Sequence, residues 1–408
     1  MLLSSPFTLP SGTVLPNRLL KSAMSEALGT VDNRVTPALV TLYDRWARGG
    51  TGTLVTGNVM IDRRALGEPN NVALEDDRDF AQLRAWAEAG TREGTKLVMQ
   101  LNHPGKQVPK SLNAESVSPS AVPFAKELAS FFPTPRALTD AEIRDLIVRF
   151  GRSASLAKAA GFSGVQIHGA HGYLVSQFLS PHHNRREDDW GGSPERRMRF
   201  VLEAYEAIRA AVGPSFLVSI KLNSADFQKG GFTEEESLGV VAALAKRGID
   251  LVEISGGTYE APVMAKGVSQ KESTAKREAY FLDFAAKVRA SVTVPLAVTG
   301  GFRTREGIEA ALASGAIDVA GLGRALALDP DFSAKLLGAG EVVSAVEPIK
   351  TGIGPIDRMA MMEVGFYSRQ IRRMGRGRDP KPNESRLLAA LALLSEQGIG
   401  TMRTRLRA

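Results

Sequence analysis

The chain has 408 residues, of which 43% are hydrophobic and 23% charged, so it can bury the core of an ordinary globular protein. It contains no cysteine, which excludes disulfides, thiol nucleophiles, thiolate-bound zinc and iron–sulfur clusters held by cysteines. The formal net charge is +7, and the segment 345–408, with twelve Lys or Arg and six Asp or Glu, carries +6 of it.

The start of the chain predicts a small hairpin. Phe7-Thr8-Leu9 and Thr13-Val14-Leu15 flank Pro10-Ser11-Gly12, a turn sequence between two short apolar stretches. No apolar run approaches the roughly 18 residues of a membrane helix, and residues 1–9 lack the basic start of a secretion signal. We therefore expect a cytoplasmic protein with no membrane contact.

Eight short apolar runs predict eight strands, and several are rich in Val, Ile and Leu, which is typical of strands covered on both faces. The predicted strands are Leu19–Ala23, Thr53–Thr56, Lys96–Leu101, Gly164–Ile167, Phe216–Lys221, Leu251–Ile254, Leu296–Thr299 and Asp318–Gly321.

Helix signals lie between many of these runs. They are Thr36-Pro37, the capping boxes Thr139/Glu142 and Thr233/Glu236, Ser193-Pro194, and the stretch 305–314 before Gly315. Alternation of strands and helices indicates an α/β fold, a (β/α)8 TIM barrel with an N-terminal hairpin and a helical C-terminal extension. An open doubly wound sheet is the alternative.

The domain boundaries follow from the last strand. We assign 1–335 to the barrel and 336–408 to a basic helical C-terminal extension that packs on the barrel or on a partner subunit of a homodimer. Within the extension, 356–374 and 385–397 are the expected helices. The Pro- and Ser-rich segment 103–138 reads as an elaborated loop, a kind that often carries function.

The strongest chemical signal follows the fourth predicted strand, at the catalytic face of a barrel. His168, His171 and Tyr173 lie within six residues, separated by glycines that allow sharp turns. Two imidazole N–H groups can hold an oxygen on which charge builds, and a tyrosine hydroxyl can deliver a proton. A structural role for either histidine and a metal site are the alternatives; no third ligand is evident, so we expect no metal.

This segment, Ile167–Pro181, resembles the substrate-binding stretch of the old yellow enzyme family, and Asn184–Arg197 is very similar to that family's next signature. The resemblance runs from about Pro6 to Phe332. It implies FMN across the barrel mouth, with NADH or NADPH as electron donor.

The resemblance also implies which residues hold FMN. Ala23, Met24 and Ser25 match the end of the family's first strand. Gly57 matches a small residue beside the isoalloxazine ring, and Gln100 matches an amide that forms hydrogen bonds with the flavin pyrimidine edge. The glycines Gly300, Gly301 and Gly323 together with Arg324 match the phosphate site between the last two strands.

Two departures from the family pattern concern redox tuning. Lys221 stands where the family usually has Arg near flavin N1/O2; it keeps the positive charge and loses the bidentate fork. Ala23 replaces the usual Pro, and Ser25 replaces the more common Thr or Cys.

The function that the resemblance implies is that of an ene-reductase. Hydride passes from NAD(P)H through flavin N5 to the β-carbon of an α,β-unsaturated carbonyl or nitro compound, in a ping-pong mechanism. His168 and His171 hold the substrate oxygen, and Tyr173 protonates the α-carbon.

Two other functions stay open. One is a flavin-dependent oxidase or demethylase on the same barrel. The other is a binding protein with an inactive barrel, whose basic tail contacts nucleic acid or a membrane surface. We expect a small-molecule substrate and no nucleic acid, because no aromatic-rich binding motif accompanies the charges.

Overall fold

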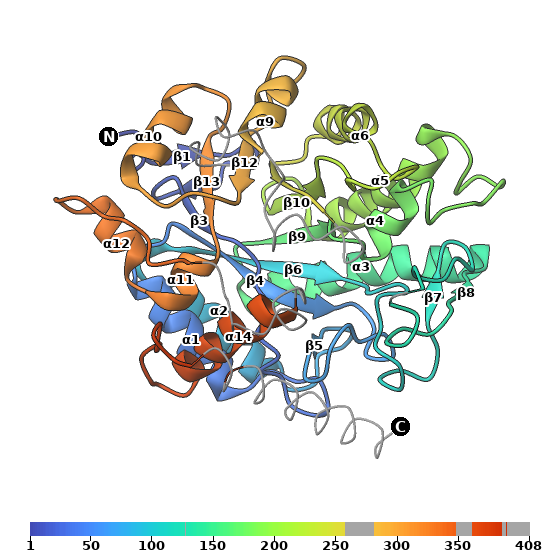
Figure 1. The fold of residues 1–408 in the computed structure, drawn as a ribbon, viewed down its shortest axis with the longest axis horizontal. Helices are drawn as coiled ribbons and strands as arrows, with labels where there is room; N and C mark the ends of the chain where they lie inside the picture. Colours follow the sequence, from blue (N-terminus) through green and yellow to red (C-terminus); the bar gives the residue numbers. More distant parts are fainter. Residues whose placement is uncertain (127, 258–280, 348–360, 386–388, 390–408) are drawn as a thin grey trace.

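The computed structural model describes residues 1–126, 128–257, 281–347, 361–385 and 389. Eight parallel strands close into a barrel (Figure 1), because β3 pairs with both β4 and β13. In barrel order the strands are β3 (Leu19–Lys21), β4 (Thr53–Met60), β6 (Lys96–Asn102), β9 (Gly164–Gly169), β10 (Leu217–Asn223), β11 (Leu251–Ser255), β12 (Leu296–Thr299) and β13 (Val319–Leu322). The predicted TIM barrel is confirmed, and the doubly wound alternative is wrong.

The predicted hairpin is confirmed at the barrel floor. β1 (Phe7–Thr8) pairs antiparallel with β2 (Val14–Leu15). Leu9 and Leu15 pack with Val55, Val98 and other inward-facing side chains of the strands. The hairpin therefore closes the end of the barrel opposite the predicted site.

Helices surround the barrel (Figure 1). The α-helices are α1 (Pro37–Arg48), α2 (Phe80–Gly90), α3 (Asp140–Ala160), α4 (Leu174–Leu179), α5 (Pro194–Val212), α6 (Glu234–Lys246), α9 (Leu282–Arg289), α10 (Arg305–Ala313), α11 (Arg324–Leu328), α12 (Phe332–Leu337) and α14 (Met361–Gly375). A short 3-10 turn, η1 (Arg92–Gly94), follows α2. Their apolar faces and the outward-facing side chains of the strands form one continuous core.

Both predicted capping boxes are confirmed, at the starts of α3 and α6. Ser193 also caps α5, with Pro194 in the first turn. Thr36 is the N-cap residue of α1 and Pro37 its first residue, as predicted, but the Thr36 side chain makes no cap bond: its hydroxyl donates to the carbonyl oxygen of Leu28 at 2.6 Å. The hydroxyl thus ties the preceding loop to the helix start.

The long segments after β4 and β6 contain short strands of their own. Three short strands lie at this end of the barrel. They are β5 (Val72–Ala73), which pairs with β4, and β7 (Val117–Ser118), which pairs with β8 (Arg136–Ala137). Met60, Leu66 and Val108 belong to a small separate apolar cluster beneath the loops. These loops cover the mouth of the barrel next to β4 and β6.

In the C-terminal extension, α14 packs against α1 and α11 of the barrel (Figure 1). The helix expected over 356–374 begins at Met361 in the described residues, and most of the helix expected over 385–397 lies outside them. α14 therefore reaches the barrel mouth of its own chain.

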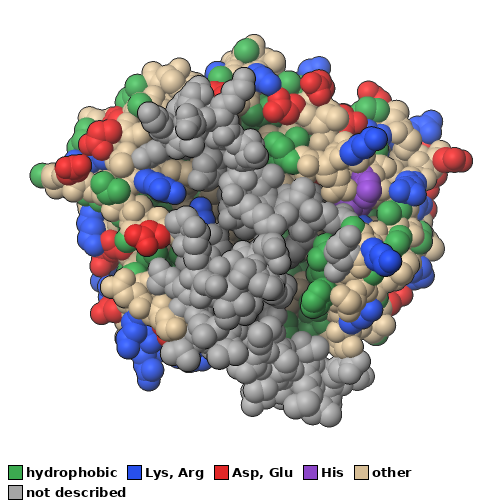
Figure 2. Space-filling view, in the orientation of Figure 1, with side chains coloured by type: hydrophobic (Ala, Val, Ile, Leu, Met, Phe, Trp, Pro, Cys, Tyr) green, Lys and Arg blue, Asp and Glu red, His purple; other side chains and the backbone are tan. Residues whose placement is uncertain are grey.

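The described part of the chain contains no helix with the length and apolar character to cross a bilayer. Figure 2 shows basic and acidic side chains interspersed over the visible face, outside the grey region.

Candidate active site

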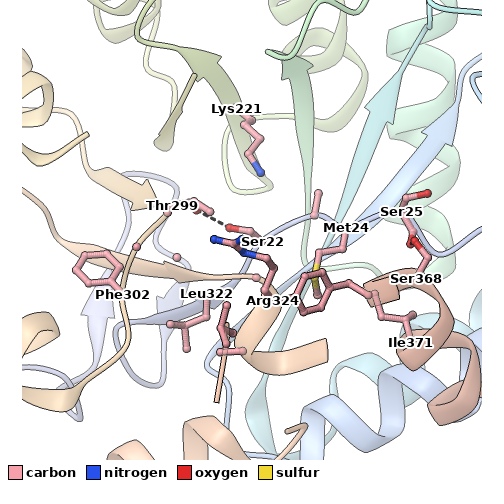
Figure 3. A pocket seen from close by; sticks show the side chains of 18 of the residues that line it. Ser22, Met24, Ser25, Lys221, Thr299, Phe302, Leu322, Arg324, Ser368 and Ile371 are labelled. Atoms are coloured by element: carbon pink, nitrogen blue, oxygen red, sulfur yellow. Dashed lines mark hydrogen bonds between the residues drawn. The ribbon is translucent and has the colours of Figure 1, made fainter. Parts of the chain in front are cut away.

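A pocket with about 1160 Å³ of space, part of it open to solvent, lies at the carboxyl ends of the barrel strands. This is the face at which TIM barrels place their active sites. Of the residues predicted to hold the cofactor, eight line it: Ala23, Met24, Ser25, Lys221, Gly300, Gly301, Gly323 and Arg324. His171 lines it too, so strands that are distant in sequence meet at one pocket (Figure 3).

Lys221 extends from β10 into this pocket and is 2% exposed (Figure 3). Its Nζ lies 3.0 Å from Oε1 of Glu253, on the neighbouring strand β11. Glu253 is fully buried and accepts hydrogen bonds from Ser22 and Thr299 at 2.6 Å and from Gln166 at 2.8 Å. The pocket floor is therefore a saturated polar network.

The charge of this network follows from its contacts. Burial by itself would raise the pKa of Glu253, but the Lys221 ammonium and hydrogen bonds from Ser22, Thr299 and Gln166 outweigh it, and the pKa is lowered. Glu253 is thus a carboxylate at neutral pH, paired with the cation that faces the pocket.

The opposite part of the pocket has the properties of an anion site. Gly300 and Gly301 have φ of +121° and +98°, a backbone conformation that side chains disfavour. Gly323 leads into α11, whose first residue is Arg324, and the guanidinium carbon lies 6.0 Å from the ring centre of Tyr367 in α14. Backbone N–H groups beside a guanidinium suit a phosphate.

The structure brings the three predicted catalytic side chains together. The ring of His168 lies 5.2 Å from that of His171 and 4.7 Å from that of Tyr173, edge to face in both cases. His168 is the last residue of β9 whose side chain faces into the barrel, because it pairs in register with Lys221, which also faces inward. His171 adopts φ of +60°, and its backbone N–H donates to Asn223 Oδ1 at 3.2 Å, which fixes the turn.

Hydrogen bonds define how each imidazole can act. Nδ1 of His168 accepts from the N–H of Ala170 at 3.3 Å, so the proton of the neutral ring resides on Nε2. Nε2 of His171 lies 2.7 Å from Ser255 Oγ. If the Ser255 hydroxyl donates, His171 keeps a proton on Nδ1 for another partner.

Both imidazoles are neutral at physiological pH. Burial, followed by the Lys221 charge, lowers the pKa of His171 to about 3. Burial, His171 and Lys221 hold the pKa of His168 well below its ordinary value. Each ring can therefore donate one hydrogen bond and carries no charge of its own.

Ser25 lines the pocket, but its hydroxyl hydrogen is directed away from it. The hydroxyl donates to Glu68, a carboxyl whose pKa burial raises. The backbone oxygen of Ser25 accepts from Ser368 of α14 at 2.9 Å. The C-terminal helix therefore holds the segment that follows β3.

Gly57 and Gln100 lie outside the pocket lining. The N–H of Gly57 donates to Glu26 at 3.1 Å, and an added Cβ would lie 2.6 Å from the Met24 oxygen. Gln100 is 1% exposed and gives its amide N–H to Gln166 at 2.8 Å. Both support residues that line the pocket or its floor.

Sequence reasoning missed several residues at the site: Ser22, Glu253, Thr299, Tyr367 and Ser368. Glu253 had a visible signal, since a carboxylate interrupts the apolar run Leu251–Ile254. Tyr367 and Ser368 had none, because only the tertiary fold brings α14 to the barrel mouth. In the described residues no group of His, Asp and Glu could hold a metal ion.

Comparison with known proteins gives the class of the chain. Residues 3–338 match the family described as NADH:flavin oxidoreductase / NADH oxidase, and the chain belongs to this family. It is an NAD(P)H-dependent flavin oxidoreductase of the old yellow enzyme type, in a family that uses flavin and NADH.

Individual relatives agree with this assignment. The chain is 39% identical over 350 residues to the NADH-dependent flavin oxidoreductase iliE of Hypocrea jecorina, covering 80% of this chain and 86% of that one. A 2-naphthoyl-CoA reductase structure superposes with a TM-score of 0.74 at 26% identity, over 82% of this chain and 52% of that one. An old yellow enzyme homologue from Zymomonas mobilis shares the fold, with a TM-score of 0.72 at 23% identity. The match covers 84% of this chain and 94% of that one.

Proposed function

We propose that this protein binds FMN in the pocket at the barrel mouth and uses NADH or NADPH to reduce activated carbon–carbon double bonds. The clustering of His168, His171 and Tyr173 at a pocket that Lys221 and Arg324 line is the observation that carries the proposal.

The residues present fit FMN. The pocket opens at the barrel mouth and is lined by both cationic and apolar side chains, as a cofactor with a phosphate and a flat ring system requires. Arg324 and the backbone of Gly300, Gly301 and Gly323 would hold the phosphate, and Lys221 would supply a cation at the ring. Met24, Leu322 and Ile371 offer apolar contact (Figure 3).

Bound FMN supplies hydride transfer between the nicotinamide and the substrate. The protein positions the substrate and stabilises charge. Neutral His168 and His171 donate to the carbonyl or nitro oxygen, which gains negative charge as the β-carbon accepts hydride. Because neither ring is charged beforehand, the two donors can share one oxygen without repelling each other.

Tyr173 completes the reaction by protonating the α-carbon. Its O–H bond breaks, the C–H bond forms, and the phenolate regains a proton from water. Each turnover consumes one NAD(P)H and one proton and adds two hydrogens across the double bond. The nicotinamide and the alkene use the same pocket in turn, so we expect ping-pong kinetics.

Two relatives' names support this choice of reaction. The iliE protein is called an NADH-dependent flavin oxidoreductase, and the other relative is by its name a reductase of 2-naphthoyl-CoA. The names agree with reduction and favour NADH as donor, which initial rates with NADH and NADPH will compare.

The purified protein tests the proposal. We expect a yellow preparation that releases FMN on denaturation and oxidises NADH faster when 2-cyclohexenone is added. A para-substituted phenol should give a long-wavelength absorption band, which His168→Ala/His171→Ala removes. A band that persists in this variant refutes the pocket assignment. Oxygen consumption whose rate does not change when the alkene is added would favour an oxidase.

A further inference from the structure

Strand β4 contains an irregularity beside the proposed active site. Val55 pairs with Val98 of β6, but the next register pair is Asn58 with Gln100, so β4 has one residue more than its partner between them. Such bulges redirect side chains and are common next to active sites. Here the extra residue lies at Thr56–Gly57.

The bulge changes which face of β4 points into the barrel. Val55 and Val98 face inward together at the barrel floor, and Gln100 faces inward above them, bonded to Gln166. Strict alternation would place Gly57 inward at this level and Asn58 outward. The extra residue instead gives Asn58 the same side as Gln100.

Specific contacts hold the bulge. Gln100 N–H donates to Thr56 Oγ1 at 2.9 Å, so a side chain replaces the missing backbone acceptor. Gly57 N–H donates to Glu26 at 3.1 Å, and Glu26 in turn is bonded to Tyr43. A buried carboxylate and a hydroxyl are thus committed to keeping the irregularity in place.

The redirected amide meets the proposed proton donor. Nδ2 of Asn58 donates to Tyr173 Oη at 3.3 Å. The other amide atom, Oδ1, is buried and has no hydrogen-bond partner in the described part of the chain. Native proteins rarely leave a buried hydrogen-bond acceptor without a partner. Because Oδ1 makes no bond that could orient the Asn58 amide, the bond from Nδ2 to Tyr173 sets its orientation.

We propose that Asn58 is a positioning residue for Tyr173. An N–H that donates to the phenol oxygen turns the hydroxyl hydrogen away from β4 and stabilises the charge that develops on the oxygen as the proton leaves. The inference rests on the proposed function, since it assigns a partner to the proton donor.

Separate measurement of the two half-reactions tests the inference. Asn58→Asp has nearly the same volume but cannot donate from an ionised side chain, and Asn58→Leu removes both polar atoms. We expect each to slow alkene reduction by the reduced protein about tenfold, with a larger solvent isotope effect. Reduction of the protein by NADH, which needs no proton from Tyr173, should change less than about twofold.

A double variant gives the sharper readout. Tyr173→Phe/Asn58→Leu should be no slower than Tyr173→Phe alone, because Asn58 acts through Tyr173. Thr53→Val removes a buried hydroxyl of the same strand that has no hydrogen-bond partner among the described residues, and it should leave both half-reactions unchanged. Asn58→Ser provides a third replacement if Asn58→Leu does not fold.

The outcomes separate this inference from the proposed function. If Tyr173→Phe is slow but the Asn58 variants match the wild type, the positioning role alone is refuted. It is also refuted if the Asn58 variants slow both half-reactions equally, or if Tyr173→Phe/Asn58→Leu reduces the alkene more slowly than Tyr173→Phe alone. If Tyr173→Phe keeps the wild-type rate, the proposed proton donor and the inference fail together.

Discussion

Lys221 and Glu253 face each other from neighbouring strands, with Nζ and Oε1 3.0 Å apart at the floor of the pocket. A lysine in place of the family's usual arginine loses the fork that can bond two groups at once. Glu253 compensates part of its charge, so the positive field at the pocket floor is weaker than Lys221 alone would give. The Lys221–Glu253 pair therefore influences the reduction potential of a bound flavin.

Substitutions at the two positions should therefore move the FMN midpoint potential in opposite directions. Lys221→Met leaves a carboxylate at the floor and should lower the potential, while Glu253→Gln leaves the cation and should raise it. We expect shifts on the order of 30 mV, equivalent for two electrons to about 1.4 kcal/mol. Spectroelectrochemical titration measures them, and shifts of the same sign would indicate misfolding rather than electrostatics.

Acid should destabilise the protein through its buried imidazoles. The pKa of His171 is lowered from 6.5 to about 3, so between these values the unfolded chain binds a proton that the folded chain does not. The contribution of His171 to the unfolding free energy is therefore fully present above pH 6.5. It falls by about 1.4 kcal/mol for each pH unit as the pH drops from 6.5 toward 3.

His171→Gln isolates the contribution, because glutamine keeps a polar group and does not titrate. Urea unfolding at pH 6 and pH 4 should show a smaller loss of unfolding free energy in the variant than in the wild type. Equal losses in the two proteins would contradict the assignment of a buried, neutral His171.

Local sequence was enough to predict much of this site. His168, His171 and Tyr173 come from one short segment at the end of a strand, and the strand order of a barrel places the glycines that follow β12 and β13 at the same face. Capping boxes such as Thr139/Glu142 were also readable, since their partners are three residues apart.

The remaining features depend on contacts between distant segments. The bond of Glu253 to Lys221 requires the register of β10 and β11, and the bulge at Gly57 requires the register of β4 and β6. Thr36 occupies the expected N-cap position, but its hydroxyl bonds Leu28 in the preceding loop instead of the helix N–H groups. A periodicity of apolar residues contains none of this information.

The C-terminal helix should contribute to cofactor binding. Tyr367 is 5% exposed, lines the pocket and lies over the Arg324 guanidinium. Tyr367→Leu keeps an apolar side chain but removes the cation–π contact, worth roughly 0.5–2 kcal/mol, so the FMN dissociation constant should rise about twofold to thirtyfold. Flavin fluorescence titration measures it.

Arg376→Ala serves as the matched control for the helix, because this residue is exposed just beyond the end of α14. It removes one charge of the basic tail and should leave FMN affinity unchanged. A loss of affinity in Arg376→Ala equal to that in Tyr367→Leu would point to the tail's charge, not to the packing of Tyr367 on Arg324.

Gly57→Ala should be disproportionately harmful for a single methyl group. The added Cβ would lie 2.6 Å from the Met24 carbonyl oxygen and 3.1 Å from Glu26 Oε2, so the backbone must move. We expect a loss of roughly 1–3 kcal/mol in unfolding free energy and weaker FMN binding, because Met24 lines the pocket. Gly239→Ala, on an exposed helical position where the nearest atom is 3.9 Å away, should instead be neutral or stabilising. Thermal unfolding of both variants compares them, and a Gly57→Ala protein as stable as the Gly239→Ala protein would show that this close approach carries no strain.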